Sequence, residues 1–141
     1  MSNGRFETND LSELRALQRV FREAKFSLDP DDSELSTSPV VNAMFCRVME
    51  ELVAAQSEED PAAEERWNAW LRLSSNRDEW IASVKRAAML PHWLNFNAST
   101  KLKMMKEVIC PFNASESQIQ ELIEEADAVS RMASNTRSEH P

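Results

Sequence analysis

The chain has 141 residues, of which 42% are hydrophobic and 28% charged, close to the averages of soluble globular domains. This composition excludes wholesale disorder and a membrane-embedded protein. The single glycine, Gly4, argues against β-sheet proteins, whose hairpins need glycine, and against phosphate-binding loops, which need several. We therefore predict one all-α domain, a compact orthogonal bundle of about six helices.

The net charge of −8 is distributed unevenly along the chain. Residues 27–65 hold eleven acidic side chains and one basic one, whereas residues 66–110 hold eight basic and three acidic ones. A negative net charge opposes nonspecific attachment to nucleic acid and to anionic lipid. Because the sequence also contains no signal-peptide pattern and no run of about 18 apolar residues, we expect a cytoplasmic protein without a membrane partner.

Prolines and apolar spacing divide the chain into six predicted helices. Proline in a helix interior costs about 3 kcal/mol, and each proline of this chain falls between periodic apolar segments or at the chain end. Within the segments, apolar residues recur at helical spacing. The predicted helices cover residues 11–25, 39–56, 61–74, from Asn76 to Met89 or Leu90, 99–109, and from Ser115 to about residue 133.

The starts of these helices carry capping residues, whose side chains accept hydrogen bonds from free backbone amides. Asp10, Ser38 and Ser115 fit this role, and the last of them forms a capping box with Gln118. Asp60 is followed by proline at the start of the third helix. At the start of the fourth helix, Asn76 is followed three residues later by Glu79.

Between and beyond the helices, the sequence predicts several kinds of connecting segment. We expect an N-terminal arm at residues 1–9, a helical domain at residues 10–133 and a flexible polar tail at residues 134–141. The acidic, serine-rich stretch 27–38 predicts a surface loop, whereas the apolar stretch 91–98 predicts a loop packed on the core. The second helix has the widest apolar face, which favours it as the central helix.

The tetrapeptide Phe-Asn-Ala-Ser occurs twice, at residues 96–99 and 112–115, each time before a predicted helix. Both copies match the N-glycosylation sequence, but that modification needs a secretory route for which we find no signal. The similarity does not extend into the following helices, so we interpret both copies as helix-start chemistry rather than as a repeat.

Few residues offer catalytic chemistry. The histidines are His92 and His140, and the cysteines, Cys46 and Cys110, lie among apolar residues, which favours reduced structural thiols over a reactive thiolate. The histidine pairs of zinc proteases and the glutamate and histidine pairs of di-metal helical sites are missing from the sequence. We expect a non-catalytic protein with no metal site and no cofactor.

The remaining chemistry favours binding to another protein. Opposed charges speed encounter and set specificity, so the acidic surface predicts a partner with a basic surface. The adjacent Met104 and Met105 cannot both face the core, which leaves one methionine, with nearby aromatic rings and lysines, as an exposed anchor. The predicted partner-binding residues are Trp93, Phe96, Met104, Lys101, Lys103 and Lys106.

Two alternatives remain open from the sequence. Residues 66–110 combine the excess of basic residues with all four tryptophans, a mixture that single-strand nucleic-acid binders use for stacking and phosphate contacts. A small-molecule-binding or enzymatic helical domain, with a pocket near His92, is the second alternative. The preferred prediction is a small cytosolic inhibitor, adaptor or immunity-type protein.

Overall fold

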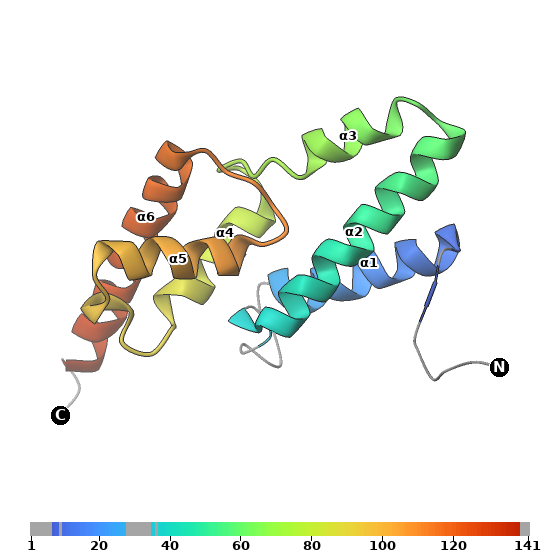
Figure 1. Cartoon of the computed structure of the whole chain (residues 1–141). Helices are drawn as coiled ribbons and strands as arrows, with labels where there is room; N and C mark the ends of the chain where they lie inside the picture. The colour runs from blue at the N-terminus through green and yellow to red at the C-terminus, as the bar shows by residue number, and fades with distance from the viewer. Residues whose placement is uncertain (1–6, 9, 28–34, 36, 139–141) are drawn as a thin grey trace.

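A computed structural model describes residues 7–8, 10–27, 35 and 37–138 (Figure 1). The described residues form α-helices and no β-strand, so the predicted all-α bundle of six helices is confirmed. The predicted arm, the loop at 27–38 and the end of the tail lie mostly outside the described residues. The elements are α1 (Leu11–Phe26), α2 (Pro39–Glu59), α3 (Ala63–Trp70), α4 (Asp78–Ala88), the 3₁₀ turn η2 (Trp93–Asn95), α5 (Ala98–Ile109) and α6 (Glu116–Ser138).

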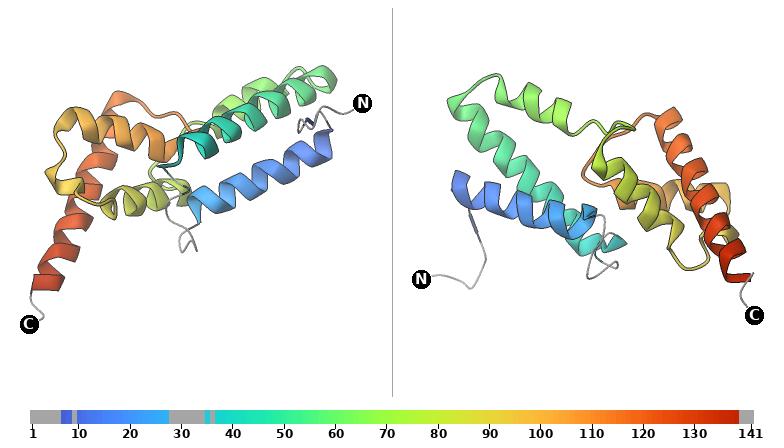
Figure 2. Two further views of the ribbon diagram at one scale, coloured as in Figure 1. Left: turned by 60° about the horizontal axis from the view of Figure 1, so that its bottom comes forward. Right: turned by 180° about the vertical axis from the view of Figure 1, so that it is seen from behind.

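The helices form two groups that meet near the middle of the molecule (Figures 1 and 2). In one group α1 packs along α2, and α3 folds back against α2. In the other group α4, α5 and α6 pack against one another. One hydrophobic core runs through both groups, from Phe45 of α2 through Trp80 of α4 to Leu122 of α6.

The central helix is α4, and the expectation that the second helix holds this position is wrong. Eight of the eleven residues of α4 are buried. On α2 the predicted apolar face is only partly covered, because Val40 stays 68% exposed and Met44 44% exposed. The small residues Ala82, Ser83 and Ala87 let neighbouring helices approach α4 closely, whereas the wide face of α2 has neighbours on only part of its length.

Most predicted helix starts are confirmed by hydrogen bonds. The Asp10 carboxylate accepts from the Glu13 amide at 3.1 Å, and the Ser38 hydroxyl accepts from the Val41 amide at 3.2 Å. Ser115 and Gln118 form the predicted reciprocal capping box. These bonds satisfy amides that have no partner inside the helix.

The fourth helix starts differently from the prediction. Its N-cap residue is Arg77, which makes no side-chain capping bond, and the helix begins at Asp78. Asn76 instead accepts a hydrogen bond from the Ser74 hydroxyl at 2.8 Å. The Arg77 side chain instead contacts Trp70, Arg72 and Glu79.

The third helix is shorter than predicted at both ends, since it begins at Ala63 with Ala62 as its N-cap, rather than at Pro61, and ends at Trp70 rather than at residue 74. The backbone that follows pairs with the segment before α6: the Leu73 amide donates to the Asn113 carbonyl at 2.8 Å, and the Asn113 amide donates to the Leu71 carbonyl at 2.7 Å. This long-range pairing uses the Leu71 carbonyl and the Leu73 amide, while the Leu71 amide still donates to the Trp67 carbonyl inside the helical turn. At the other end of the chain, α6 continues to Ser138, so the predicted tail is partly helical.

Candidate functional site

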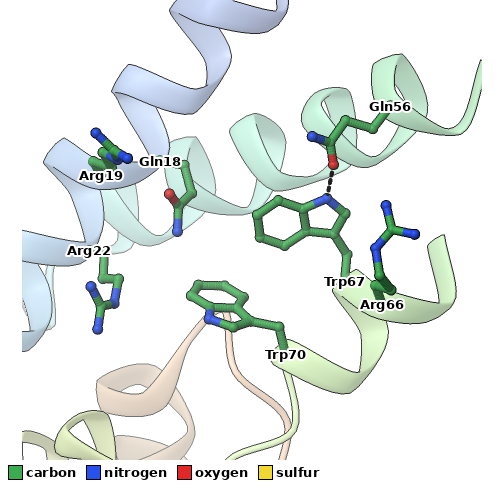
Figure 3. Close-up of a pocket in the computed structure, with 7 residues that line it drawn as sticks. All are labelled: Gln18, Arg19, Arg22, Gln56, Arg66, Trp67 and Trp70. Atoms are coloured by element: carbon green, nitrogen blue, oxygen red, sulfur yellow. Dashed lines mark hydrogen bonds between the residues drawn. The ribbon is translucent and has the colours of Figure 1, made fainter. Parts of the chain in front are cut away.

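A cleft of about 580 Å³ lies where α1 faces α3 (Figure 3). Three helices supply its lining. Gln18, Arg19 and Arg22 come from α1, Gln56 comes from α2, and Arg66, Trp67 and Trp70 come from α3.

The two indoles of the cleft come from one face of α3. Residues three apart on a helix are neighbours, so Trp67 and Trp70 lie together, with ring centroids 5.4 Å apart in an edge-to-face arrangement. The Trp67 indole N–H donates to the Gln56 side-chain oxygen, which ties α3 to α2. The Trp70 ring also packs against Phe112, at 4.8 Å between centroids. Both indoles are half-buried, and both lie against the cleft.

The three arginines of the cleft differ in their ion pairs. Arg66 pairs with Asp60 at 2.6 Å, and this hydrogen bond holds the pKa of the Asp60 carboxyl below its ordinary value. Arg22 pairs with Glu79 at 3.3 Å. Arg19 is exposed and makes no ion pair with another described residue. The cleft therefore presents at least one guanidinium group whose charge no carboxylate of the described chain neutralises.

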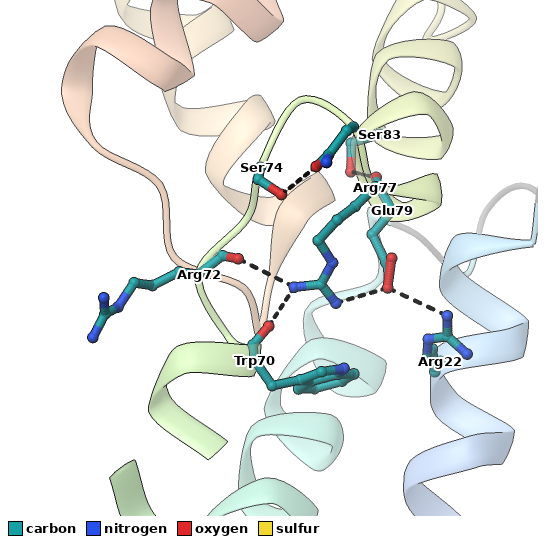
Figure 4. Close-up of polar contacts among 8 residues, drawn as sticks. Arg22, Trp70, Arg72, Ser74, Arg77, Glu79 and Ser83 are labelled. Carbon is teal, nitrogen blue, oxygen red and sulfur yellow. Dashed lines mark hydrogen bonds and ion pairs between the residues drawn. The ribbon is translucent and has the colours of Figure 1, made fainter. Parts of the chain in front are cut away.

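Arg77 supports the cleft from behind (Figure 4). Its guanidinium group donates to the backbone carbonyls of Trp70 and Arg72 and pairs with Glu79 at 2.8 Å. The same group lies over the Trp70 ring, at 5.3 Å from the centroid. Arg77 therefore fixes the chain at the end of α3, and with it the position of the Trp70 indole.

Glu79 joins this support to the wall of the cleft, because one carboxylate oxygen accepts from both Arg77 and Arg22. Burial raises the pKa of Glu79. The hydrogen bond from Arg77 and the charges of Arg77 and Arg22 lower the pKa by more than burial raises it, so the net pKa is below the ordinary value. Glu79 is thus held as a carboxylate between two guanidinium groups. One positive charge remains on this three-residue cluster.

The predicted anchor around residues 93–104 does not form an exposed surface. Trp93, a predicted partner-binding residue, is only 1% exposed, so its ring does not present a surface to a partner. Its indole N–H donates to Asp127 at 2.9 Å, which holds the ring against α6. Phe96 is half-buried and contacts the Trp93 ring, which confirms that the loop at 91–98 packs on the core. Met105 is buried and Met104 is half-buried, as expected for adjacent residues of one helix.

The predicted lysines are only partly available to a partner. Lys101 pairs with Asp127 at 2.8 Å and lies over the Trp93 ring, so its charge is neutralised by α6. Arg86, which would extend a basic patch, is buried and donates to the Ser27 carbonyl. Lys103 and Lys106 remain exposed on α5. The structure therefore brings Trp93, Phe96 and Lys101 together as a packed cluster, and the six predicted residues do not form one open basic and aromatic patch.

Among the described residues, His92 and the two cysteines lie at different places in the fold. His92 is exposed at the turn after α4, whereas the two cysteines face each other between α2 and the end of α5. No three histidine, cysteine or acidic side chains of the described residues gather as metal ligands would. Among the described helices, none is both long enough and apolar enough to cross a bilayer.

The cleft itself was missed by sequence reasoning. The three-residue spacing of Trp67 and Trp70 does not predict the cleft, because spacing alone cannot separate a core face of a helix from a cleft face. The available signal was the pair Arg19 and Arg22, which lies on α1 at the same three-residue spacing as the two tryptophans. Comparison of the chain with protein-family models, curated proteins and solved structures finds no match.

Proposed function

We propose that this protein is a non-catalytic interaction module that binds an acidic segment of a partner protein in the arginine–tryptophan cleft. The observation that carries the proposal is the lining of the cleft, where three guanidinium groups and two indoles surround about 580 Å³. Tryptophan and arginine are enriched among the interface residues that dominate binding energy.

The charges of the cleft define the ligand chemistry. A guanidinium group offers a planar fork of donors that matches a carboxylate, and Arg19 has no carboxylate partner among the described residues. The half-buried indoles offer apolar area beside that fork. A fitting segment therefore carries carboxylates next to an apolar or aromatic side chain.

The surroundings of the cleft favour a protein over a nucleic acid. Glu58 and Glu59 are exposed at the end of α2, and Glu65 is exposed beside Arg66 on α3. A nucleic acid would bring a row of phosphates along this acidic surface, whereas a peptide can place one or two carboxylates in the cleft alone. The acidic surface also supports the prediction that the partner has basic side chains of its own, outside the segment that enters the cleft.

A display selection with random peptides against the full-length protein tests the proposal. Peptides that bind should be enriched in acidic and aromatic residues. Their affinity should fall at least tenfold for the Arg19→Glu variant, because the substitution places a carboxylate opposite the carboxylates of the peptide.

Lys103→Glu is the matched control for this selection. It makes the same change in net charge at an exposed site on α5, outside the cleft, and should leave the affinity within about twofold. If both variants lose affinity equally, only net charge matters and the cleft is not the site. If oligonucleotides bind and the selected peptides do not, the nucleic-acid alternative replaces the proposal.

A further inference from the structure

The two cysteines meet where the two helix groups join. Cys46 lies on α2, and Cys110 ends α5, 64 positions later in the chain. Both are free thiols, and their sulfur atoms lie 3.1 Å apart. Such a contact between distant segments requires that the surrounding structure hold both side chains in place.

Polar contacts on both sides of the thiols supply this restraint. Buried Lys25 of α1 donates to the carbonyls of Glu107 at 3.0 Å and Cys110 at 2.5 Å, which places a cation at the C-terminus of α5. Asn42 of α2 donates to the Glu107 carbonyl at 3.2 Å and to its carboxylate at 2.6 Å. The last turn of α5 is thus fastened to α1 and α2 beside the sulfur pair.

Cys46 is reachable from outside. It lines a second cleft, of about 490 Å³, together with Met49, Val53, Leu71 and Pro111. This cleft lies on the α2 and α3 side of the molecule and shares no lining residue with the arginine–tryptophan cleft. A small oxidant that enters this cleft reaches Cys46, whereas Cys110 is not part of the cleft lining.

We propose that Cys46 and Cys110 are a reversible modification site, at which a hydroperoxide oxidises the two thiols to an intramolecular disulfide that locks α2 to the end of α5. A disulfide bond measures about 2.0 Å, so the sulfur atoms need to approach by about 1 Å. The site does not depend on the proposed partner-binding function, since the two rest on different residues.

The chemistry occurs in two steps that balance. The Cys46 thiolate attacks one oxygen of the hydroperoxide, the O–O bond breaks, and the product is a Cys46 sulfenic acid with water or an alcohol as the leaving group after protonation. The Cys110 sulfur then attacks the Cys46 sulfur, the S–O bond breaks, and the Cys110 proton leaves with the hydroxide as water. Two thiols are oxidised by two electrons, and one peroxide bond is reduced.

The positions of the sulfur atoms assign the order of these steps. Burial and the neighbouring Cys46 thiol raise the pKa of Cys110 to about 12, which keeps this residue in the thiol form. Cys46 is the residue on the cleft wall. Cys46 therefore reacts first, and Cys110 resolves the sulfenic acid.

Treatment of the reduced full-length protein with hydrogen peroxide tests this proposal by intact mass and by thiol counting after denaturation. The protein should lose the mass of two hydrogen atoms, and both thiols should disappear together at a rate independent of protein concentration. Tryptic digestion should give one peptide pair that links Cys46 to Cys110, and dithiothreitol should restore both thiols.

The single variants distinguish the order of attack. Cys110→Ser should accumulate a sulfenic acid at Cys46 that dimedone traps, while Cys46→Ser should react much more slowly. Stepwise addition of oxygen atoms to the wild-type protein, or disulfide-linked dimers in place of the internal bond, would overturn the proposal. The proposal would also be overturned if both thiols stayed intact at a peroxide concentration that fully oxidises glutathione in the same tube. This measurement uses the wild-type protein and does not depend on the folding of a variant.

Discussion

Replacement of Arg77 by alanine should destabilise the protein far more than replacement of Arg22, although both arginines pair with the same carboxylate oxygen of Glu79. The Glu79 side chain is only 4% exposed. Arg77 is 20% exposed and lies 2.8 Å from the shared oxygen, whereas Arg22 is 47% exposed and lies 3.3 Å from it. The two variants therefore compare a largely buried ion pair with an exposed one on one acceptor.

The magnitudes follow from burial. Loss of Arg77 leaves a nearly buried carboxylate with one long contact, and breaking a buried pair in this way costs about 3–5 kcal/mol. The Trp70 and Arg72 carbonyls also lose their donor, and Trp70 and Phe112 lose the guanidinium group over their rings. Loss of Arg22 removes an exposed pair, which contributes about 0–1 kcal/mol.

Urea unfolding at neutral pH, followed by circular dichroism, measures both free energies. Glu79→Gln supplies a third variant, because it removes the charge that Arg77→Ala leaves unpaired. The double variant, Arg77→Ala with Glu79→Gln, should then lose less free energy of unfolding than the two single variants lose together. The difference should be about 1–3 kcal/mol. Equal losses for Arg77→Ala and Arg22→Ala, or strict additivity in the double variant, would refute this reasoning.

Three other measurements test the structure at different positions. Burial lowers the pKa of Lys25 from 10.5 to about 8 and raises the pKa of Cys110 from 9.0 to about 12. From pH 8 to 9 the unfolded chain binds the extra lysine proton, so urea unfolding should show stability rising by up to about 1.4 kcal/mol. Above pH 9 Cys110 loses its proton in the unfolded chain but keeps it in the folded protein, which opposes the lysine effect, so the rise in stability should flatten. In the Cys110→Ala variant the rise in stability should continue toward pH 10.5. Asn97→Ala should cost about 1 kcal/mol, because the Asn97 side chain caps α5 at 2.8 Å from the Thr100 amide, whereas Asn113→Ala should cost less, since Asn113 pairs through its backbone. A disulfide between Cys46 and Cys110 closes a loop across 64 positions and should raise the free energy of unfolding by up to about 4 kcal/mol, measured on oxidised and reduced protein.

Local patterns predicted the helices well because their causes are local. Asp10, Ser38 and Ser115 cap helices through bonds within three residues, and such bonds can be inferred from the sequence alone. The two copies of Phe-Asn-Ala-Ser show the limit of this inference. In the first copy Asn97 is the cap, whereas in the second the cap is Ser115, so one tetrapeptide starts two helices in different registers.

The site depended on contacts that spacing cannot reveal. Trp93 and Trp67 both carry an indole N–H that needs an acceptor. Trp93 is buried against α6, where Asp127, 34 positions later in the chain, accepts its indole N–H. Likewise, the end of α3 is set by pairing with Asn113, far along the chain. The arginines of α1 and the tryptophans of α3 form one cleft only because both helices pack against α2.

The indole N–H signals of the four tryptophans give the most direct test of the central claim, that the arginine–tryptophan cleft binds an acidic partner segment. Trp67 and Trp70 line the cleft, whereas Trp80 and Trp93 are buried and donate to Glu125 and Asp127 of α6. In ¹H–¹⁵N spectra, titration with a selected acidic peptide should shift the Trp67 and Trp70 signals and leave the other two unchanged. Shifts confined to Trp80 and Trp93, or binding without any shift of Trp67 and Trp70, would contradict the account.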